Sequence, residues 1–131
     1  MFLSHSDVKR AGLSLAKANA DLQVVLKNPQ AGDNYATLFG KVIAQATFTS
    51  TDMAINTVGN DEVGTINGKA DVDQSDVAAD TDDLCMALVD TVNSKFYYIV
   101  DAVDKAISND DGETISWNAW SITVKGLALA V

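Results

Sequence analysis

The pattern of hydrophobic and polar positions predicts three consecutive β-strands between residues 84 and 124. Residues 84–89 and 95–100 form two short, nearly unbroken apolar runs, and the polar segment 90–94 between them is typical of a hairpin turn. Apolar residues occur at both parities in these runs, which means that both faces of the strand pair must be covered. We therefore expect this hairpin in the middle of a sandwich or at a contact between subunits.

The third of these strands, residues 114–124, contains a change of phase. Its alternation places Ile115, Trp117 and Ala119 on one face, but the next apolar positions, from Trp120 onward, are out of step by one residue. Such a slip indicates either a β-bulge or a strand that crosses from one sheet to another. Either arrangement is typical of a small β-sandwich.

The amino-terminal segment predicts a helix over residues 6–19. A serine, Ser4 or Ser6, stands before Asp7 and could cap the first backbone amides of a helix. The acidic side chain of Asp7 in the first turn would interact favourably with the helix dipole. Apolar residues then recur at helical spacing as far as Asn19, which provides an end. The residues of this helix that we expect to contact a partner are Val8 and Leu15.

The middle of the chain predicts further strands. Gly64 and Gly68 fall on one face of the longest of them, which leaves room for another backbone or a large ring to approach closely. Residues 35–41 are ambiguous and could form one helical turn. The segments with extended character are 22–26, 42–48, 53–58 and 62–72.

Together these elements predict a mainly β fold. With 131 residues the chain has the size of one domain, in which residues 1–20 form an amino-terminal helix or arm and residues 21–131 form the β domain. We expect about six or seven strands, arranged as a small antiparallel β-sandwich or β-barrel-like domain with one amino-terminal α-helix.

Charge narrows the class of partner. The formal net charge is −9, so a polyphosphate ligand is repelled at long range and nucleic acid is not an expected partner.

No apolar run approaches the roughly 20 residues that span a bilayer, and the first residues lack the features of a signal peptide, so we expect no membrane association. The single cysteine, Cys85, lies inside an apolar run, where a thiol acts as a small hydrophobe.

The acidic segment 71–83 is the place in the sequence where a metal site could lie. Its carboxylates suit calcium, and Asp71, Asp73 and Asp76 are the candidate ligands. Their spacing departs from an EF-hand loop, however, because the turn glycine and the final glutamate are missing. A solvated acidic loop explains the segment better, so we expect neither a metal nor another cofactor.

Catalysis has few candidate residues. His5 is the only histidine and lies near the amino terminus, so a histidine-based triad has no well-held base. The glycines are too widely spaced for a phosphate-cradling loop. We therefore expect no catalytic residues and no enzyme activity.

The aromatic residues of the second half allow two interpretations. Tyr97, Trp117 and Trp120 could form a platform for a sugar or a partner protein, or they could fill the sandwich. The face that carries Trp117 is otherwise apolar, which favours the core for this residue. The phase slip leaves the direction of Trp120 open.

Several short motifs occur in an order that resembles the small virion structural proteins of tailed bacteriophages. The motifs are Thr47-Phe48 before Asp52-Met53, the strand Val63-Gly64-Thr65-Ile66, the run from Ala87 through Asp90-Thr91 to Lys95, and the closing strand 114–124. The sequence departs from this family in Thr81-Asp82-Asp83, where a glycine-threonine pair is expected, and in its final residues 126–131. These departures leave open whether the protein belongs to the head or to the tail.

The resemblance implies a non-enzymatic capsid decoration or cement protein. Such a protein is present in many copies on the virion after synthesis in the host cytoplasm, and its partners are copies of itself, with a trimer favoured, and the major capsid protein. The apolar end of the chain could add a strand to a neighbour or could be the last core strand, and its candidate contact residues are Leu127 and Leu129. The alternatives are a tail-associated receptor- or glycan-binding module and a calcium-binding β domain.

Overall fold

The computed structural model describes residues 3–5, 12–75, 82–102, 108–110 and 114–125. Its strands are β1 (Leu3–Ser4), β2 (Leu22–Lys27), β3 (Val42–Thr47), β4 (Met53–Val58), β5 (Asp61–Ile66), β6 (Lys69–Asp73), β7 (Leu84–Asp90), β8 (Lys95–Asp101), β9 (Ser108–Asp110), β10 (Thr114–Trp117) and β11 (Trp120–Val124). Its helices are α2 (Leu13–Asn19), α3 (Tyr35–Phe39) and a 3₁₀ turn at Ser50–Asp52.

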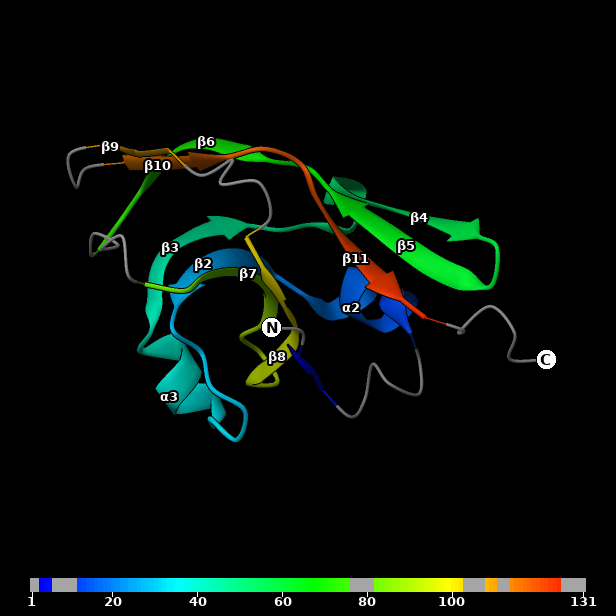
Figure 1. Cartoon of the computed structure of the whole chain (residues 1–131), viewed down its shortest axis with the longest axis horizontal. Coiled ribbons are helices and arrows are strands. Elements are labelled where there is room, and N and C mark those ends of the chain that lie inside the picture. The colour runs from blue at the N-terminus through cyan, green and yellow to red at the C-terminus, as the bar shows by residue number, and fades with distance from the viewer. Residues whose placement is uncertain (1–2, 6–11, 76–81, 103–107, 111–113, 126–131) are drawn as a thin grey trace.

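These strands form three antiparallel sheets. The body sheet has five strands in the order β1-β8-β7-β2-β3, the arm sheet has the order β11-β5-β4, and the rim sheet has the order β6-β10-β9. In Figure 1 the body sheet is strongly curved, the rim sheet lies across it, and the arm sheet extends beyond it. The predicted mainly β, sandwich-like fold class is confirmed.

The hairpin of β7 and β8 forms the centre of the body sheet and is covered on both faces, as the sequence predicts. Its strands pair from Cys85 opposite Asp101 to Asp90 opposite Lys95. One face, with Met86 and Leu88, packs into the core that contains α2 and the strands of the arm and rim sheets. The other face, with Ala87 and Val89, packs around Leu38 of α3. Full burial of an aliphatic side chain contributes about 1.5–3 kcal/mol, so this hairpin is a main source of stability.

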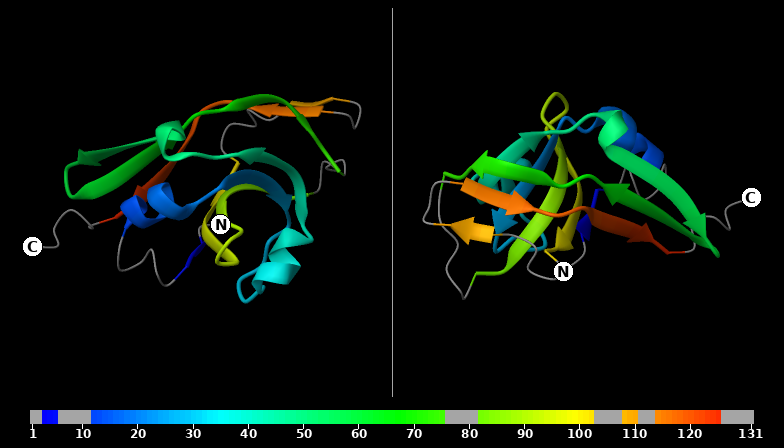
Figure 2. Two further views of the ribbon diagram at one scale, coloured as in Figure 1. Left: turned by 180° about the vertical axis from the view of Figure 1, so that it is seen from behind. Right: turned by 90° about the horizontal axis from the view of Figure 1, so that it is seen from above.

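A long two-stranded ribbon joins the arm sheet to the rim sheet. One of its sides is β5 followed by β6, and the other is β10 followed by β11; Ile66 lies opposite Trp120 and Lys69 opposite Trp117. Both sides therefore change sheet at the same place (Figure 2). The phase slip between residues 117 and 120 is thus a crossing between sheets, which is one of the two predicted explanations.

Glycine permits the close approach at this crossing. A Cβ atom on Gly68 would lie 2.3 Å from the carbonyl oxygen of Trp117, so only glycine fits without a shift of backbone. The sequence predicts one continuous strand over residues 62–72, and this prediction is wrong. The structure divides the segment into β5 and β6, which Asn67 and Gly68 separate.

Helix α2 covers the inner face of the arm sheet. It ends at Asn19 as predicted but begins at Leu13, because Gly12 has a positive φ of 75° and is not helical. Leu13 is fully buried, lies 3.2 Å from the position of a Cβ on Gly64, and donates its backbone N–H to the Glu62 carboxylate at 3.2 Å. The predicted start of this helix, residues 6–11, lies outside the described residues.

Two further predictions need correction. The structure has a second α-helix, α3, where the sequence was ambiguous; Asn34 caps it by accepting the backbone N–H of Thr37 at 2.8 Å. The number of strands exceeds six or seven, since five lie in the body sheet and three in each of the other sheets. The prediction missed β1 and β9 because strands of two and three residues carry too little alternation to be recognised.

Neither α-helix in the described part of the chain is long and apolar enough to cross a membrane.

Candidate functional site

Trp117 and Trp120 converge on one buried side chain of the body sheet. Gln23 lies on β2 and is fully buried, and its carbonyl oxygen accepts the indole N–H of Trp117 at 2.9 Å and that of Trp120 at 3.2 Å. Trp117 is only 4% exposed, whereas Trp120 is half-buried. These bonds attach the ribbon to the body sheet, and Trp117 lies in the core, which is the position that the sequence favours.

Tyr97 is also a core residue. Its side chain is 2% exposed, and its hydroxyl donates to the carboxylate of Asp90 at 2.8 Å. Asp90 further accepts the backbone N–H of Asn93 at 3.0 Å and the side-chain amide of Asn93 at 2.7 Å. Tyr97 therefore supports the β7–β8 turn and fills the core, which is one of the two positions that the sequence left open.

The same contacts set the protonation of Asp90. Burial raises the pKa of its carboxyl group, but the hydrogen bonds from Asn93, Tyr97 and the backbone of Val92 outweigh burial. The pKa consequently lies below the usual aspartate value, and the group stays ionised at neutral pH. Its hydrogen bonds tie Asp90 to the turn and to Tyr97.

The proposed calcium ligands lie apart from any cluster in the described residues. Asp71 and Asp73 are exposed on β6, and Asp76 lies outside the described residues. The backbone N–H of Asp71 donates to the hydroxyl of Ser116 at 2.9 Å, which holds this strand to β10.

A different group of residues could in principle hold an ion. Asp83, Cys85 and Asp101 place their candidate ligand atoms within 4.8 Å of one another. Burial, followed by the charges of the two aspartates, raises the pKa of the Cys85 thiol to about 12. Since a metal binds the thiolate, this environment disfavours the ligand form of Cys85.

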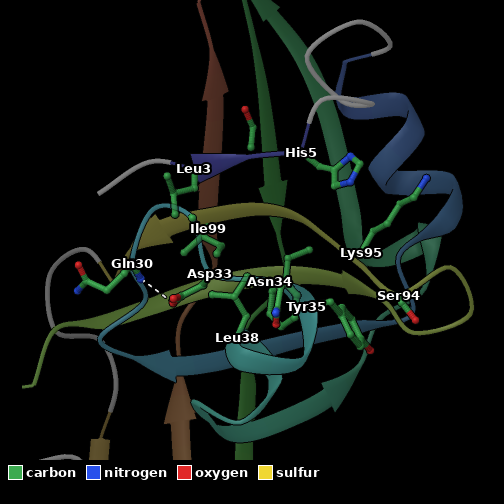
Figure 3. A pocket seen from close by; sticks show the side chains of 13 residues that line it. Leu3, His5, Gln30, Asp33, Asn34, Tyr35, Leu38, Ser94, Lys95 and Ile99 are labelled. Carbon is green, nitrogen blue, oxygen red and sulfur yellow. Dashed lines mark hydrogen bonds between the residues drawn. The ribbon is translucent and has the colours of Figure 1, made fainter.

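A cleft opens between β1 and the loop before α3 (Figure 3). Its volume is about 350 Å³, and its apolar lining comes from Leu3, Leu38, Phe96 and Ile99. The polar residues around it are Ser4, His5, Gln30, Asp33, Asn34, Tyr35, Ser94 and Lys95. In Figure 3, His5 and Lys95 lie on one side of the cleft, and Gln30 and Asp33 lie on the other.

The loop at this cleft is held by Asp33. Its carboxylate pairs with Lys41 at 2.6 Å and accepts the backbone N–H of Gln30 at 2.9 Å. These two contacts, with the Lys41 hydrogen bond the larger cause, lower the pKa of Asp33. No pattern in the sequence predicts this cleft, because its walls come from three separate segments.

The outer edge of the arm sheet is the most exposed apolar feature among the described strands. Strand β4 pairs with β5 on one side only, and Ala54, Asn56 and Val58 are exposed on the face that α2 does not cover. Val58 is 61% exposed. Residues 42–60 contain a single charged residue, Asp52, in a chain with a net charge of −9. Asp52 itself lies 3.6 Å from the ammonium group of Lys69.

The remaining predicted contact residues divide into two groups. Leu15 is half-buried on α2 and packs against the main core, so part of its side chain contributes to folding. Val8, Leu127 and Leu129 lie outside the described residues.

No protein-family model, no curated protein and no solved structure matches this chain.

Proposed function

We propose that this protein is a non-enzymatic virion structural protein of a tailed bacteriophage, and specifically a capsid decoration or cement protein. It would act by binding copies of itself and the major capsid protein. The observation that carries the proposal is the arm sheet, which extends from the body and presents one open face and an uncharged outer edge. A protein whose role is adhesion needs such a surface outside its core.

The buried polar groups support a structural role. Gln23 bonds both tryptophans, and Asp90 bonds Asn93 and Tyr97, so these side chains stabilise contacts within the fold. The Cys85 thiol, with its pKa raised to about 12, is a poor nucleophile at neutral pH. The side chains of Gln23 and Asp90 thus serve packing and the thiol of Cys85 stays protonated, which supports a structural role for these residues.

Repeated weak contacts suit a decoration protein. Each contact on a shell needs only modest affinity, because several contacts made by one particle or one oligomer act together. The net charge of −9 keeps free copies soluble and apart, while the uncharged edge of the arm sheet lets copies approach locally. The homo-oligomer, and the trimer that the resemblance implies, belong to this proposal.

Co-sedimentation with capsids tests the proposal. The purified protein is mixed with capsids of a phage that encodes it, prepared without this protein, and the capsids are pelleted. We expect the protein to pellet in a saturable manner and to raise the temperature at which the capsids disrupt, since a ligand of the intact shell stabilises it. An unrelated acidic protein of similar size serves as the control. Failure to pellet with these capsids would overturn the proposal.

A further inference from the structure

The edge strands of the three sheets differ in how they are protected. Natural sheets blunt their edges with short strands, charged side chains or covering segments. In the body sheet, β1 has only two residues, and β3 is covered by the bridge of Ala44 to Gln74 and by the Ser75 N–H, which donates to the Ile43 carbonyl at 2.8 Å. In the rim sheet, β9 has three residues. On the far side of the arm sheet, β11 has five residues, of which only Ser121 is exposed.

Strand β4 has none of these protections within the described residues. It is six residues long, its sequence is MAINTV, and it contains no charge and no proline. Among the described edge strands that no other segment covers, β4 is the longest, and it is more exposed than β11. It is therefore the edge best suited to pair with another strand.

The hydrogen-bond pattern shows which backbone groups of β4 face outward. The Asn67 N–H donates to the Asp52 carbonyl at 2.9 Å, and bonded positions alternate along an antiparallel pair. Ala54, Asn56 and Val58 therefore bond β5, whereas Ile55 and Thr57 direct their N–H and C=O groups away from it.

We propose that β4 pairs in antiparallel orientation with the β4 of a second copy of this chain, with Asn56 at the two-fold axis. In this register Ile55 of each copy lies opposite Thr57 of the other copy. Each of these two pairs exchanges two backbone hydrogen bonds, which gives about four in total. The exposed side chain of Val58 then covers Ala54 of the second copy, and the two Asn56 amides meet on the open face.

Charge favours a second copy as the occupant. Two molecules that each carry −9 repel each other, and the repulsion is smallest where neither presents a charge. The single charge in residues 42–60, Asp52, is already paired with Lys69. The inference rests on the proposed function and specifies its self-contact, which is a two-fold dimer contact and not the trimer contact that the resemblance implies.

A charge placed at the axis tests the register. In Asn56→Lys two like charges meet across the axis, so we expect the dimer dissociation constant to rise at least about tenfold. The matched control is Val92→Lys, an 85% exposed position on the β7–β8 turn, which makes the same change in net charge and should leave the constant unaltered. The measurement is sedimentation velocity over a concentration series, with a thermal melt to verify that each variant is folded.

A cysteine at the axis provides a second measurement. Residues in a non-hydrogen-bonded antiparallel pair have Cα atoms about 4.5 Å apart, which a disulfide can bridge. We expect Asn56→Cys to form a covalent dimer under mild oxidation and Val92→Cys to remain monomeric on a denaturing gel. The native Cys85 is fully buried and should not interfere.

The outcomes separate this inference from the proposed function. A wild-type protein that stays monomeric, or an Asn56→Lys variant that dimerises as well as the wild type, would overturn the β4 contact. Co-sedimentation of the wild-type protein with capsids decides the proposed function separately, because a wild type that pellets with capsids but stays monomeric in solution overturns the β4 contact alone. A dimer that Asn56→Lys dissociates and Asn56→Cys cross-links would establish the register.

Discussion

The body sheet and the arm sheet are built from similar β-rich sequences but are covered differently. In the body sheet, residues 85–90 of β7 are all buried, because the ribbon covers one face and α3 the other. In the arm sheet, α2 covers one face only, and β4 exposes Ala54, Asn56, Thr57 and Val58. The difference indicates that stability is concentrated in the body, while the arm is free to contact a partner.

The two regions also differ in how they use polar groups. The body holds Gln23 and Asp90 in buried hydrogen-bond networks, where the loss of one partner is costly. The arm exposes polar side chains such as Asn56 on its open face, where water can satisfy them. Substitutions should therefore change folding strongly in the body and weakly in the arm.

The largest effect is expected from Trp117→Ala. This change removes a buried ring from the contact between ribbon and body and one donor from Gln23, which should lower the free energy of unfolding by about 3–5 kcal/mol. Urea unfolding followed by tryptophan fluorescence and circular dichroism measures it. Trp117→Phe is the matched control, since it keeps most of the ring and should recover more than half of the loss. Equal losses in both variants would contradict a packing role.

Two glycines on the same strand face provide the next comparison. A Cβ on Gly68 would meet backbone atoms of Trp117 and Asn118 at 2.3 and 2.7 Å, whereas on Gly64 it would meet the movable end of Met53 at 2.3 Å. We expect Gly68→Ala to cost about 3 kcal/mol and Gly64→Ala about 1 kcal/mol, because a methionine can change rotamer and a paired backbone cannot. Chemical denaturation of both variants checks this order. The reverse order would show that the sheet crossing is not rigid.

A smaller effect, dependent on pH, is expected from Asp90→Asn. The variant should lose about 2 kcal/mol at neutral pH, since the bonds from Asn93 and Tyr97 no longer reach a charged acceptor. The folded pKa of Asp90 lies below its unfolded value, so its contribution is complete above the unfolded pKa and is lost as the pH falls through the folded pKa. The difference between wild type and variant should thus shrink as the pH falls from about 5 to about 2. A constant difference across that range would argue against the ionised form.

The smallest effect on stability is expected from Val58→Ser on the arm. Its side chain is 61% exposed, so the free energy of unfolding should change by less than about 0.5 kcal/mol. Self-association should nevertheless weaken, because the apolar contact to Ala54 of a second copy is lost. Differential scanning calorimetry and light scattering measure the two quantities on the same samples. A large loss of stability would show that the division between body and arm is wrong.

Patterns within one segment were sufficient to predict much of this fold. The two apolar runs at residues 84–100 predicted a hairpin covered on both faces, and the phase slip after Ala119 predicted either a β-bulge or a crossing between sheets, of which the structure has the crossing. The pair of glycines on one face predicted close approach, which Gly68 makes with the backbone of Trp117. Each of these features follows from local alternation and sterics.

Features that join distant segments could not be predicted in the same way. Gln23 is a single polar residue in an apolar strand, and its two indole partners lie 94 and 97 residues further along the chain. The sequence alone could not decide whether Tyr97 lies in the core or on the surface. The cleft between β1 and α3 likewise exists only after the curved sheet brings its walls together.

The single thiol gives each molecule an internal reporter of opening. Cys85 is completely buried on the face of the body sheet that packs against α3, and its raised pKa keeps the thiol protonated. Alkylating reagents therefore react with this thiol only when the sheet opens. The rate of labelling therefore records how often the body opens, without any engineered probe. Dissociation of the arm from a second copy leaves Cys85 buried, so it should not change the rate of labelling.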